Sequence, residues 1–368
     1  MLTTPLETLQ KYVNQPSGSW DKEDVAAVAA MFQADFESLG FTVKQHPGTK
    51  FGPALECTIG SGKKQLMLMG HMDTVFPHAQ AIPFTDHGDG TAQGSGICDM
   101  KGGIVLMLYA LQQVLPKLDL DEYSICVILN PDEEVGSVES HELILETAKK
   151  SFAVLSFEPS GENGRLTCAR KGVTNVTIEC KGIPGHAGAK YKECASAIQA
   201  LCAHITNLYT LRDDEKEISF NAGLIKGGTA ENVVAETASC RCEFRYFDQK
   251  YQQILMEKIA AICAQEPVPG VTTSNSFGAS HPAIDLNPAS QVLLDKAQAI
   301  AKEQGREMPH ERVGGAGDIS IAGQAGVGVL DGLGMPGGMM HTTDEYGVIS
   351  MIPQQIELAA KLILSVCE

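Results

Sequence analysis

Two kinds of apolar pattern alternate along the first half of the chain. One kind is short and continuous, with the length of a buried strand, and occurs at residues 66–69, 124–129 and 153–157. The other kind spaces apolar side chains three and four residues apart, as amphipathic helices do, and occurs at residues 21–39, 102–115 and 139–149. Because strands and helices alternate, we expect an α/β fold whose mixed, largely parallel sheet is sandwiched by helices.

A different pattern begins near residue 172. The order strand, helix, strand, strand, helix, strand is predicted at residues 176–180, 195–211, 218–224, 235–244, 255–262 and 271–277. This order is typical of a ferredoxin-like α+β domain. Helical spacing returns at residues 288–303, and a final helix begins at Pro353. We therefore expect a first domain in two parts, residues 1–171 and 283–368, interrupted by an inserted domain of residues 172–282.

Charge and composition narrow the class of function. The chain carries 28 Lys and Arg against 45 Asp and Glu, a net charge of -17, which argues against nucleic acid or an anionic membrane surface as a partner. No apolar run approaches the ~18 residues of a membrane span, and we expect no signal peptide at the N-terminus. The 11 Cys form no C-x-x-C pair, and several lie inside apolar stretches, which suits reduced thiols. We expect a cytoplasmic protein.

Acidic and histidine residues stand at the points where apolar runs stop. They are His71, Asp99, the pair Glu133–Glu134, Glu158 and His341. A buried carboxylate is costly without a partner, so several that converge on one place indicate bound cations. Two His and several carboxylates, with no Cys among them, fit a catalytic zinc site better than a structural one.

The position of these residues after strands is the reason to expect that they meet. His71, Glu133–Glu134 and Glu158 each follow a predicted strand, and sites in parallel sheets form beyond the carboxyl ends of the strands. Taken one at a time, such residues also fit a loop or a solvated acidic turn. Their shared placement is what favours a common site.

Two pairs of residues indicate a division of roles. In the H-x-D sequence, His71 can bind metal through one ring nitrogen while Asp73 holds the other. The side chains of the adjacent Glu133 and Glu134 diverge, so one can bind metal while the other accepts a proton from water. Asp99 opens a helix, where it can be either an N-terminal cap or a carboxylate that bridges two metals.

Six short segments occur in this order along the chain: GHMDTVFP, GSGICDMKGG, PDEEVGS, FEPS, GIPGHAG and HTTDEYG. Together they resemble the M20 family of zinc exopeptidases and deacylases, and the branch they resemble most is glutamate carboxypeptidase. The resemblance implies two zinc ions per subunit, with Co²⁺ or Mn²⁺ as chemically suitable substitutes. It assigns His71 and Glu158 to one ion, Glu134 and His341 to the other, and Asp99 to both.

The resemblance also implies roles for residues outside the ligand set. Glu133 would be the general base, and Asp73 the hydrogen-bond partner of His71. His186 in GIPGHAG donates a hydrogen bond to the oxyanion, often from the partner subunit of a homodimer, which is expected to form through residues 172–282. Without the resemblance, His186 would be interpreted as a loop histidine. The peptide bond that follows Asp99 is expected to be cis.

Substrate recognition is expected on the inserted lid domain. The family pattern places Asn232 and Arg245 close to the carboxylate of the substrate, although Arg245 also fits an exposed charge on a sheet. Glutamate carboxypeptidases usually carry an Arg before the Pro at the end of the insert, where this chain has His281. An imidazole cannot make the bidentate contact that Arg offers a carboxylate, so a preference for glutamate is not implied.

These features predict a two-zinc hydrolase that cleaves an amide bond beside a free carboxylate. The expected reaction is carboxypeptidase-type release of a C-terminal amino acid from a small peptide. The alternative is deacylation of an N-acyl amino acid. A third hypothesis is a catalytically silent binding module, and the retention of Glu133 and of every metal position argues against it.

Overall fold

The computed structural model describes residues 2–368, which divide into two compact units. Unit 1 contains the chain up to Ala169 together with Leu286–Val313 and Gly317–Glu368. Unit 2 contains Arg170–Asp285 together with Gly314–Ala316. The boundaries therefore lie beside the expected ones, and Gly314–Ala316, which we had expected in the first domain, belongs to unit 2.

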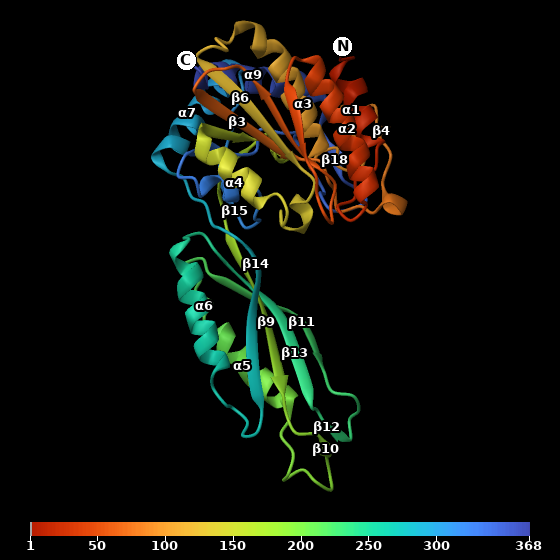
Figure 1. Cartoon of the computed structure of the whole chain (residues 1–368), viewed down its shortest axis with the longest axis vertical. Helices are drawn as coiled ribbons and strands as arrows, with labels where there is room; N and C mark the ends of the chain where they lie inside the picture. The colour runs from red at the N-terminus through yellow and green to blue at the C-terminus, as the bar shows by residue number, and fades with distance from the viewer. Residues whose placement is uncertain (1) are drawn as a thin grey trace. The chain divides into compact units, whose positions relative to one another are not determined.

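A six-stranded sheet forms the centre of unit 1 (Figure 1). In spatial order its strands are β1 (Thr42–His46), β2 (Ala54–Ile59), β6 (Tyr123–Asn130), β3 (Lys64–His71), β7 (Ser151–Ser156) and β16 (Gly328–Leu330). Neighbours among β6, β3, β7 and β16 run parallel, whereas β2 pairs antiparallel with both β1 and β6. The prediction of a mixed, largely parallel sheet is confirmed.

Helices pack on both faces of this sheet. They are α1 (Pro5–Val13), α2 (Lys22–Ser38), α3 (Lys101–Val114), α4 (His141–Lys150), α7 (Pro288–Glu303), α8 (Ile319–Gly323) and α9 (Ile352–Val366). Along β3, Leu66 and Leu68 belong to the apolar cluster that includes α3 and α9. Met67 and Met69 are also buried but lie outside that cluster, on the face where α4 contacts β3. Burial on both faces explains why this strand is a continuous apolar run in the sequence.

A pair of glycines lets α3 begin close to the end of β7. Gly102 and Gly103 lie in the first turn of α3, and a Cβ on Gly103 would lie only 2.0 Å from the carbonyl oxygen of Phe157. Any larger residue would push the helix away from the strand end that carries Glu158. The sequence DMKGG therefore places the start of α3, and with it Asp99, beside that strand end.

Short elements complete unit 1. Four strands form a second sheet, in the order β17 (Gly337–Gly338), β18 (Tyr346–Gly347), β5 (Ala92–Gln93) and β4 (Thr85–Asp86). A further pair joins β15 (His310–Val313) to β8 (Leu166–Arg170). The 3-10 turns are η1 (His78–Gln80), η2 (Leu115–Lys117), η3 (Glu133–Val135) and η4 (Ile349–Met351). Because β18 pairs with β5, the segment that carries His341 is held beside the loop that precedes Asp99.

Unit 2 is an α+β sandwich with its own apolar core. Its main elements are β9 (Gly172–Lys181), α5 (Ala197–Tyr209), β11 (Ser219–Gly227), β13 (Thr237–Tyr246), α6 (Lys250–Cys263) and β14 (Thr272–His281). The strands form an antiparallel sheet in the order β11-β13-β9-β14, which is a ferredoxin-like arrangement. A ribbon of β10 (Gly185–His186) and β12 (Val233–Val234) was not predicted.

The helices of both units differ from membrane-spanning helices. Across residues 2–368, none of them combines the length and the apolar character that crossing a bilayer requires.

Candidate metal centre

Three neighbouring strands of unit 1 end at the same edge of the sheet. β3 ends at His71, β6 ends shortly before Glu133–Glu134, and β7 ends shortly before Glu158. The three strands are adjacent and run parallel, with β3 in the middle. Their carboxyl ends therefore bring these side chains to one place, as the sequence predicted.

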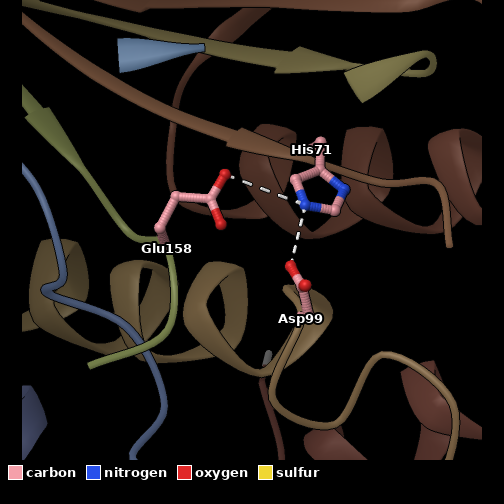
Figure 2. A group of neighbouring side chains, drawn as sticks. All are labelled: His71, Asp99 and Glu158. Carbon is pink, nitrogen blue, oxygen red and sulfur yellow. Dashed lines mark hydrogen bonds and ion pairs between the residues drawn. The ribbon is translucent and has the colours of Figure 1, made fainter. Parts of the chain in front are cut away.

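The first cluster of ligand atoms combines His71, Asp99 and Glu158 (Figure 2). Nε2 of His71 lies 3.1 Å from Oδ1 of Asp99 and 3.8 Å from Oε1 of Glu158. Figure 2 shows both carboxylates directed toward this one ring nitrogen. The His71 side chain is only 1% exposed, so the cluster is built into the interior of unit 1.

The second cluster combines Asp99, Glu134 and His341. Nε2 of His341 lies 3.2 Å from Oδ2 of Asp99 and 3.1 Å from Oε2 of Glu134. Asp99 therefore offers one carboxylate oxygen to each cluster, and its peptide bond to Met100 is cis, as the family resemblance implied. The His341 side chain is 56% exposed, and the backbone φ angles of Met339 and His341 are positive, at 57° and 63°.

Asp73 connects the buried histidine to the acidic turn. Its side-chain Oδ1 lies 3.3 Å from Nδ1 of His71, and its backbone carbonyl lies 3.0 Å from the same nitrogen. The Asp73 carboxylate also accepts hydrogen bonds from the backbone N–H groups of Glu133 and Glu134, each at 3.2 Å, and from Oγ of Ser19 at 2.7 Å. One buried carboxylate thus orients the ring of His71 and positions the turn that carries both glutamates.

The pKa values of the centre reflect burial among many carboxylates. Burial raises the pKa of Glu133 well above its usual range; the charge of His71 opposes this shift, and the nearby carboxylates Asp318, Glu158 and Glu134 add to it. Burial would also raise the pKa of Asp99, but hydrogen bonds from His341 and His71 hold it below its usual range. Hydrogen bonds to Asp99 and Glu134 raise the pKa of His341 to about 11. Both imidazole rings therefore lie in a strongly anionic environment that favours bound positive charge.

The donor set of the two clusters suits divalent cations. Each cluster offers one imidazole nitrogen and two carboxylate oxygens that lie within 4.8 Å of one another. Three protein ligands of these types leave coordination positions for water and substrate, as in catalytic zinc sites. Carboxylates gathered in this way favour bound cations, which would balance their charge.

Glu345 holds the loop that carries Asp99, and it was not predicted. Its carboxylate accepts hydrogen bonds from the backbone N–H groups of Gly96, Cys98 and Asp99 at 3.2, 2.9 and 3.0 Å. Burial raises the pKa of Glu345 to about 7. The one signal for it in the sequence is its position in the HTTDEYG segment, close to His341.

Asp318 supports the segment that follows β6, and it was missed as well. Its carboxylate accepts a hydrogen bond from Nδ2 of Asn130 at 2.6 Å and another from the hydroxyl of Ser137. Burial raises the pKa of Asp318 to about 6. Asn130 and Asp318 are 188 positions apart in the chain, and no local pattern links them.

His186 and Asn232 lie together on the ribbon of unit 2. His186 pairs with Val233 across the ribbon, and the backbone N–H of Ala187 donates to the carbonyl of Asn232 at 3.0 Å. Nδ1 of His186 accepts hydrogen bonds from the backbone N–H groups of the loop that follows, at 3.1 and 3.2 Å. In the neutral ring the proton therefore resides on Nε2, which makes that atom a hydrogen-bond donor.

Arg245 and His281 lie at the other end of the same unit. Both pair with Val173, on opposite sides of β9. Nε of Arg245 donates to Glu243 at 2.8 Å, and Nη1 donates to the carbonyl of Gly314 at 2.8 Å. β13 runs without a break from Thr237 to Arg245, which separates the two ends by about 27 Å at the usual rise of a strand.

This separation bears on the expected substrate site. Asn232 lies on the ribbon next to the start of β13, whereas Arg245 lies near its end. We expected both residues to approach one substrate carboxylate, and within a single chain the structure does not bring them together.

Comparison with known proteins gives a consistent result. The sequence model of peptidase family M20/M25/M40 matches residues 67–365. The chain is 33% identical to carboxypeptidase G2 of Pseudomonas sp. (strain RS-16), over 98% of this chain and 88% of that protein. It is 25% identical to succinyl-diaminopimelate desuccinylase of Gluconacetobacter diazotrophicus, over 94% of this chain and 92% of that protein. Its fold is similar to that of an M20 family metallo-carboxypeptidase from Sulfolobus solfataricus, with a TM-score of 0.79, 17% identity and coverage of 98% and 99% of the two chains.

Proposed function

The chain belongs to peptidase family M20/M25/M40 and is a metal-dependent hydrolase, and from this premise we propose that it uses two zinc ions to cleave an amide bond beside a free carboxylate. The observation that carries the proposal is the pair of ligand clusters that share Asp99, with Glu133 next to them. A structural metal site would have no use for a half-buried glutamate outside the ligand set.

The ligand set divides into two halves. His71 and Glu158 would hold one ion, Glu134 and His341 the other, and the two oxygens of Asp99 would contribute to both. When bound, zinc would supply Lewis acidity, which acidifies water and polarises a carbonyl group. Co²⁺ and Mn²⁺ suit the same imidazole and carboxylate donors.

Glu133 is the proposed general base. Its pKa is raised by burial, so its carboxylate has a higher proton affinity than an exposed glutamate. In this mechanism the carboxylate takes a proton from the attacking water and passes it to the leaving nitrogen. The hydrogen bond from the backbone N–H of Glu133 to Asp73 keeps the glutamate in place during both transfers.

His186 is the proposed hydrogen-bond donor to the oxyanion, through the proton on Nε2. Asn232 lies beside it and would bind the substrate near the same point. Since about 27 Å of strand separates the ribbon from Arg245, residues from both ends can reach one substrate only if two chains contribute. We therefore propose a homodimer, formed through residues 172–282, in which His186 and Asn232 act at the centre of the partner chain.

Carboxypeptidase-type release of a C-terminal amino acid is the preferred reaction, because the 33% identity to a carboxypeptidase extends over nearly the whole chain. Arg245 and His281 would bind near the substrate carboxylate. Deacylation of an N-acyl amino acid is the alternative, supported by the likeness to a desuccinylase. All 11 Cys are free thiols, which suits the reducing cytoplasm that we propose as the location.

The test is a substrate panel for the metal-loaded protein. N-acyl amino acids and dipeptides with C-terminal glutamate are assayed with and without chelator, and chelator-sensitive release from one class selects between the two reactions. Glu133→Gln should keep both metals and lower kcat by about 10³-fold. A fully active Glu133→Gln enzyme would refute the mechanism.

A mixing experiment tests the shared site. Glu133→Gln and His186→Ala proteins are each nearly inactive, and they are mixed under conditions that allow subunit exchange. If His186 acts in the partner chain, each mixed dimer regains one complete centre, and activity should return to about a quarter of the wild-type value. If His186 acts in its own chain, mixing restores nothing.

A further inference from the structure

A hollow of about 260 Å³ opens beside the metal centre on unit 1. It lies between the loop at residues 18–21 and the segment that follows β3, and Glu134 forms part of its wall. Its volume suits one aryl or branched alkyl group rather than a whole ligand of drug size. Because Glu134 belongs to the second ligand cluster, a group in this hollow would be attached close to the reacting bond.

Trp20 stands at this hollow with most of its ring exposed. It is the single Trp of the chain, its side chain is 72% exposed, and its ring contacts that of Phe51 at 5.1 Å between centroids. Val75, which is 39% exposed, lines the same hollow. Two apolar side chains left open beside a catalytic centre form a surface that a bound apolar group would cover.

The backbone around Trp20 is fixed to the metal centre. The N–H of Ser19 donates to the carbonyl of Thr74 at 3.1 Å, and the N–H of Thr74 donates to the carbonyl of Ser17 at 2.9 Å. Oγ of Ser19 donates to Asp73, the carboxylate that holds the buried histidine. These bonds fix the backbone that carries Trp20 relative to Asp73, so the indole ring is attached at a defined point beside the ligand clusters.

The charges of the hollow indicate which half of a substrate it receives. Among the described residues that line it, none is cationic, and Asp21 and Glu134 carry carboxylates. Asp21 already accepts a hydrogen bond from the backbone N–H of His78 at 2.7 Å. The half of the substrate that leaves as an amino acid carries a free carboxylate, and none of the described residues that line the hollow offers it a cationic partner. The hollow therefore suits the acyl half of the substrate, provided that this half carries no negative charge.

We propose that this hollow is the acyl-group subsite and that Trp20 is a specificity-determining residue that selects an uncharged aromatic or branched apolar acyl group. The inference rests on the proposed amide hydrolysis and adds the class of acyl group to it. The indole ring would pack against the acyl group next to the scissile carbonyl. Anionic acyl groups such as succinyl are poor substrates on this assignment.

The kinetic test compares N-benzoyl-, N-acetyl- and N-succinyl-glutamate with the zinc-loaded enzyme. Wild-type kcat/KM should be highest for benzoyl, and Trp20→Ala should lower that value roughly tenfold while changing the acetyl value less than about twofold. Trp20→Phe should retain most of the preference. The control is Phe152→Ala. This variant removes another partly exposed aromatic ring, at the end of β7 away from Glu158, and should change neither value. An unchanged ratio of benzoyl to acetyl values in Trp20→Ala would overturn the proposal.

A binding test separates this inference from the proposed function. Because Trp20 is the only Trp, intrinsic tryptophan fluorescence of the full chain reports on this one residue. Titration of zinc-loaded Glu133→Gln protein with N-benzoyl-glutamate should shift the emission to shorter wavelength, and N-succinyl-glutamate should not. If no substrate is hydrolysed, the proposed function fails, and this titration still decides whether the hollow binds an aryl group. An emission spectrum that saturating N-benzoyl-glutamate leaves unchanged would refute the subsite.

Discussion

The two halves of the metal centre differ in how firmly their histidines are held. His71 ends a central strand, is 1% exposed, and has its second ring nitrogen beside Asp73. His341 lies in a glycine-rich segment, is 56% exposed, and has a backbone conformation with positive φ. Both rings nevertheless approach the same carboxylate, Asp99, at nearly equal distances of 3.1 and 3.2 Å.

The different surroundings of the two histidines should give the two halves different affinities for metal. A ligand held by a strand and a second carboxylate loses little freedom when the metal binds, whereas a ligand on an exposed segment must be ordered by it. We therefore expect the His71 half to bind its ion more tightly and the His341 half to lose its ion first. Four experiments test this asymmetry.

Removal of the shared ligand should have the largest effect. Asp99→Ala takes one oxygen from each half, so both ions should be lost and kcat/KM should fall by about 10⁴-fold. Metal content by elemental analysis and turnover on the best substrate check this expectation. The control is Asp295→Ala on α7, an exposed carboxylate that should leave both quantities unchanged. An Asp99→Ala protein that retains both metals would show that this carboxylate is not shared.

Separate removal of each histidine compares the halves directly. His71→Ala leaves Asp73 and Asp99 buried without their imidazole, so the free energy of unfolding of the metal-free protein should fall by about 3 kcal/mol. His341→Ala removes an exposed ring and should cost less than about 1 kcal/mol. His341→Ala should still bind one ion, as judged by elemental analysis after dialysis. Equal losses of stability and of metal in the two variants would contradict the asymmetry.

Glu345 tests whether the loop that carries Asp99 must be held in place. Glu345→Gln weakens the acceptor for three backbone N–H groups, so affinity for the metals should fall by about 10- to 100-fold. Competition with a chromophoric chelator measures this change. Glu303→Gln at the end of α7 is the matched control on the surface. If zinc affinity in Glu345→Gln equals that of the wild type, this carboxylate does not position the bridging residue.

The change in metal affinity per pH unit should be the smallest of the four effects. The pKa of His341 is raised to about 11 by Asp99 and Glu134, so the metal-free ring holds a proton that a cation must displace. At pH values below the ordinary pKa of His, this proton contributes fully to the stability of the metal-free fold. The contribution is lost as pH rises through the raised pKa of about 11. Affinity of this half should therefore increase about tenfold per pH unit between about pH 6 and pH 8. The same titration of His341→Ala should show a slope smaller by one proton.

Local patterns were sufficient for the residues that follow buried strands. A strand with both faces covered must be apolar throughout, so its end is visible where His71 or Glu158 interrupts the run. Parallel neighbours end at one edge, and this geometric rule converts three separate positions into one site. The same regularity accounts for α7, whose bounds Pro288–Glu303 match the predicted helix.

Tertiary contacts decided the rest, because they join residues with no local relationship. Glu345 binds backbone groups almost 250 positions away, and the two residues of the β10 strand are too few to leave a pattern in the sequence. The length of β13 separates Asn232 from Arg245, although the family pattern places both near one substrate carboxylate. Sequence patterns and the family motifs thus predicted the main elements and all five candidate metal ligands. Only the folded chain decided which polar groups support those ligands and that Trp20 stands beside them, since burial and contact depend on packing between distant segments.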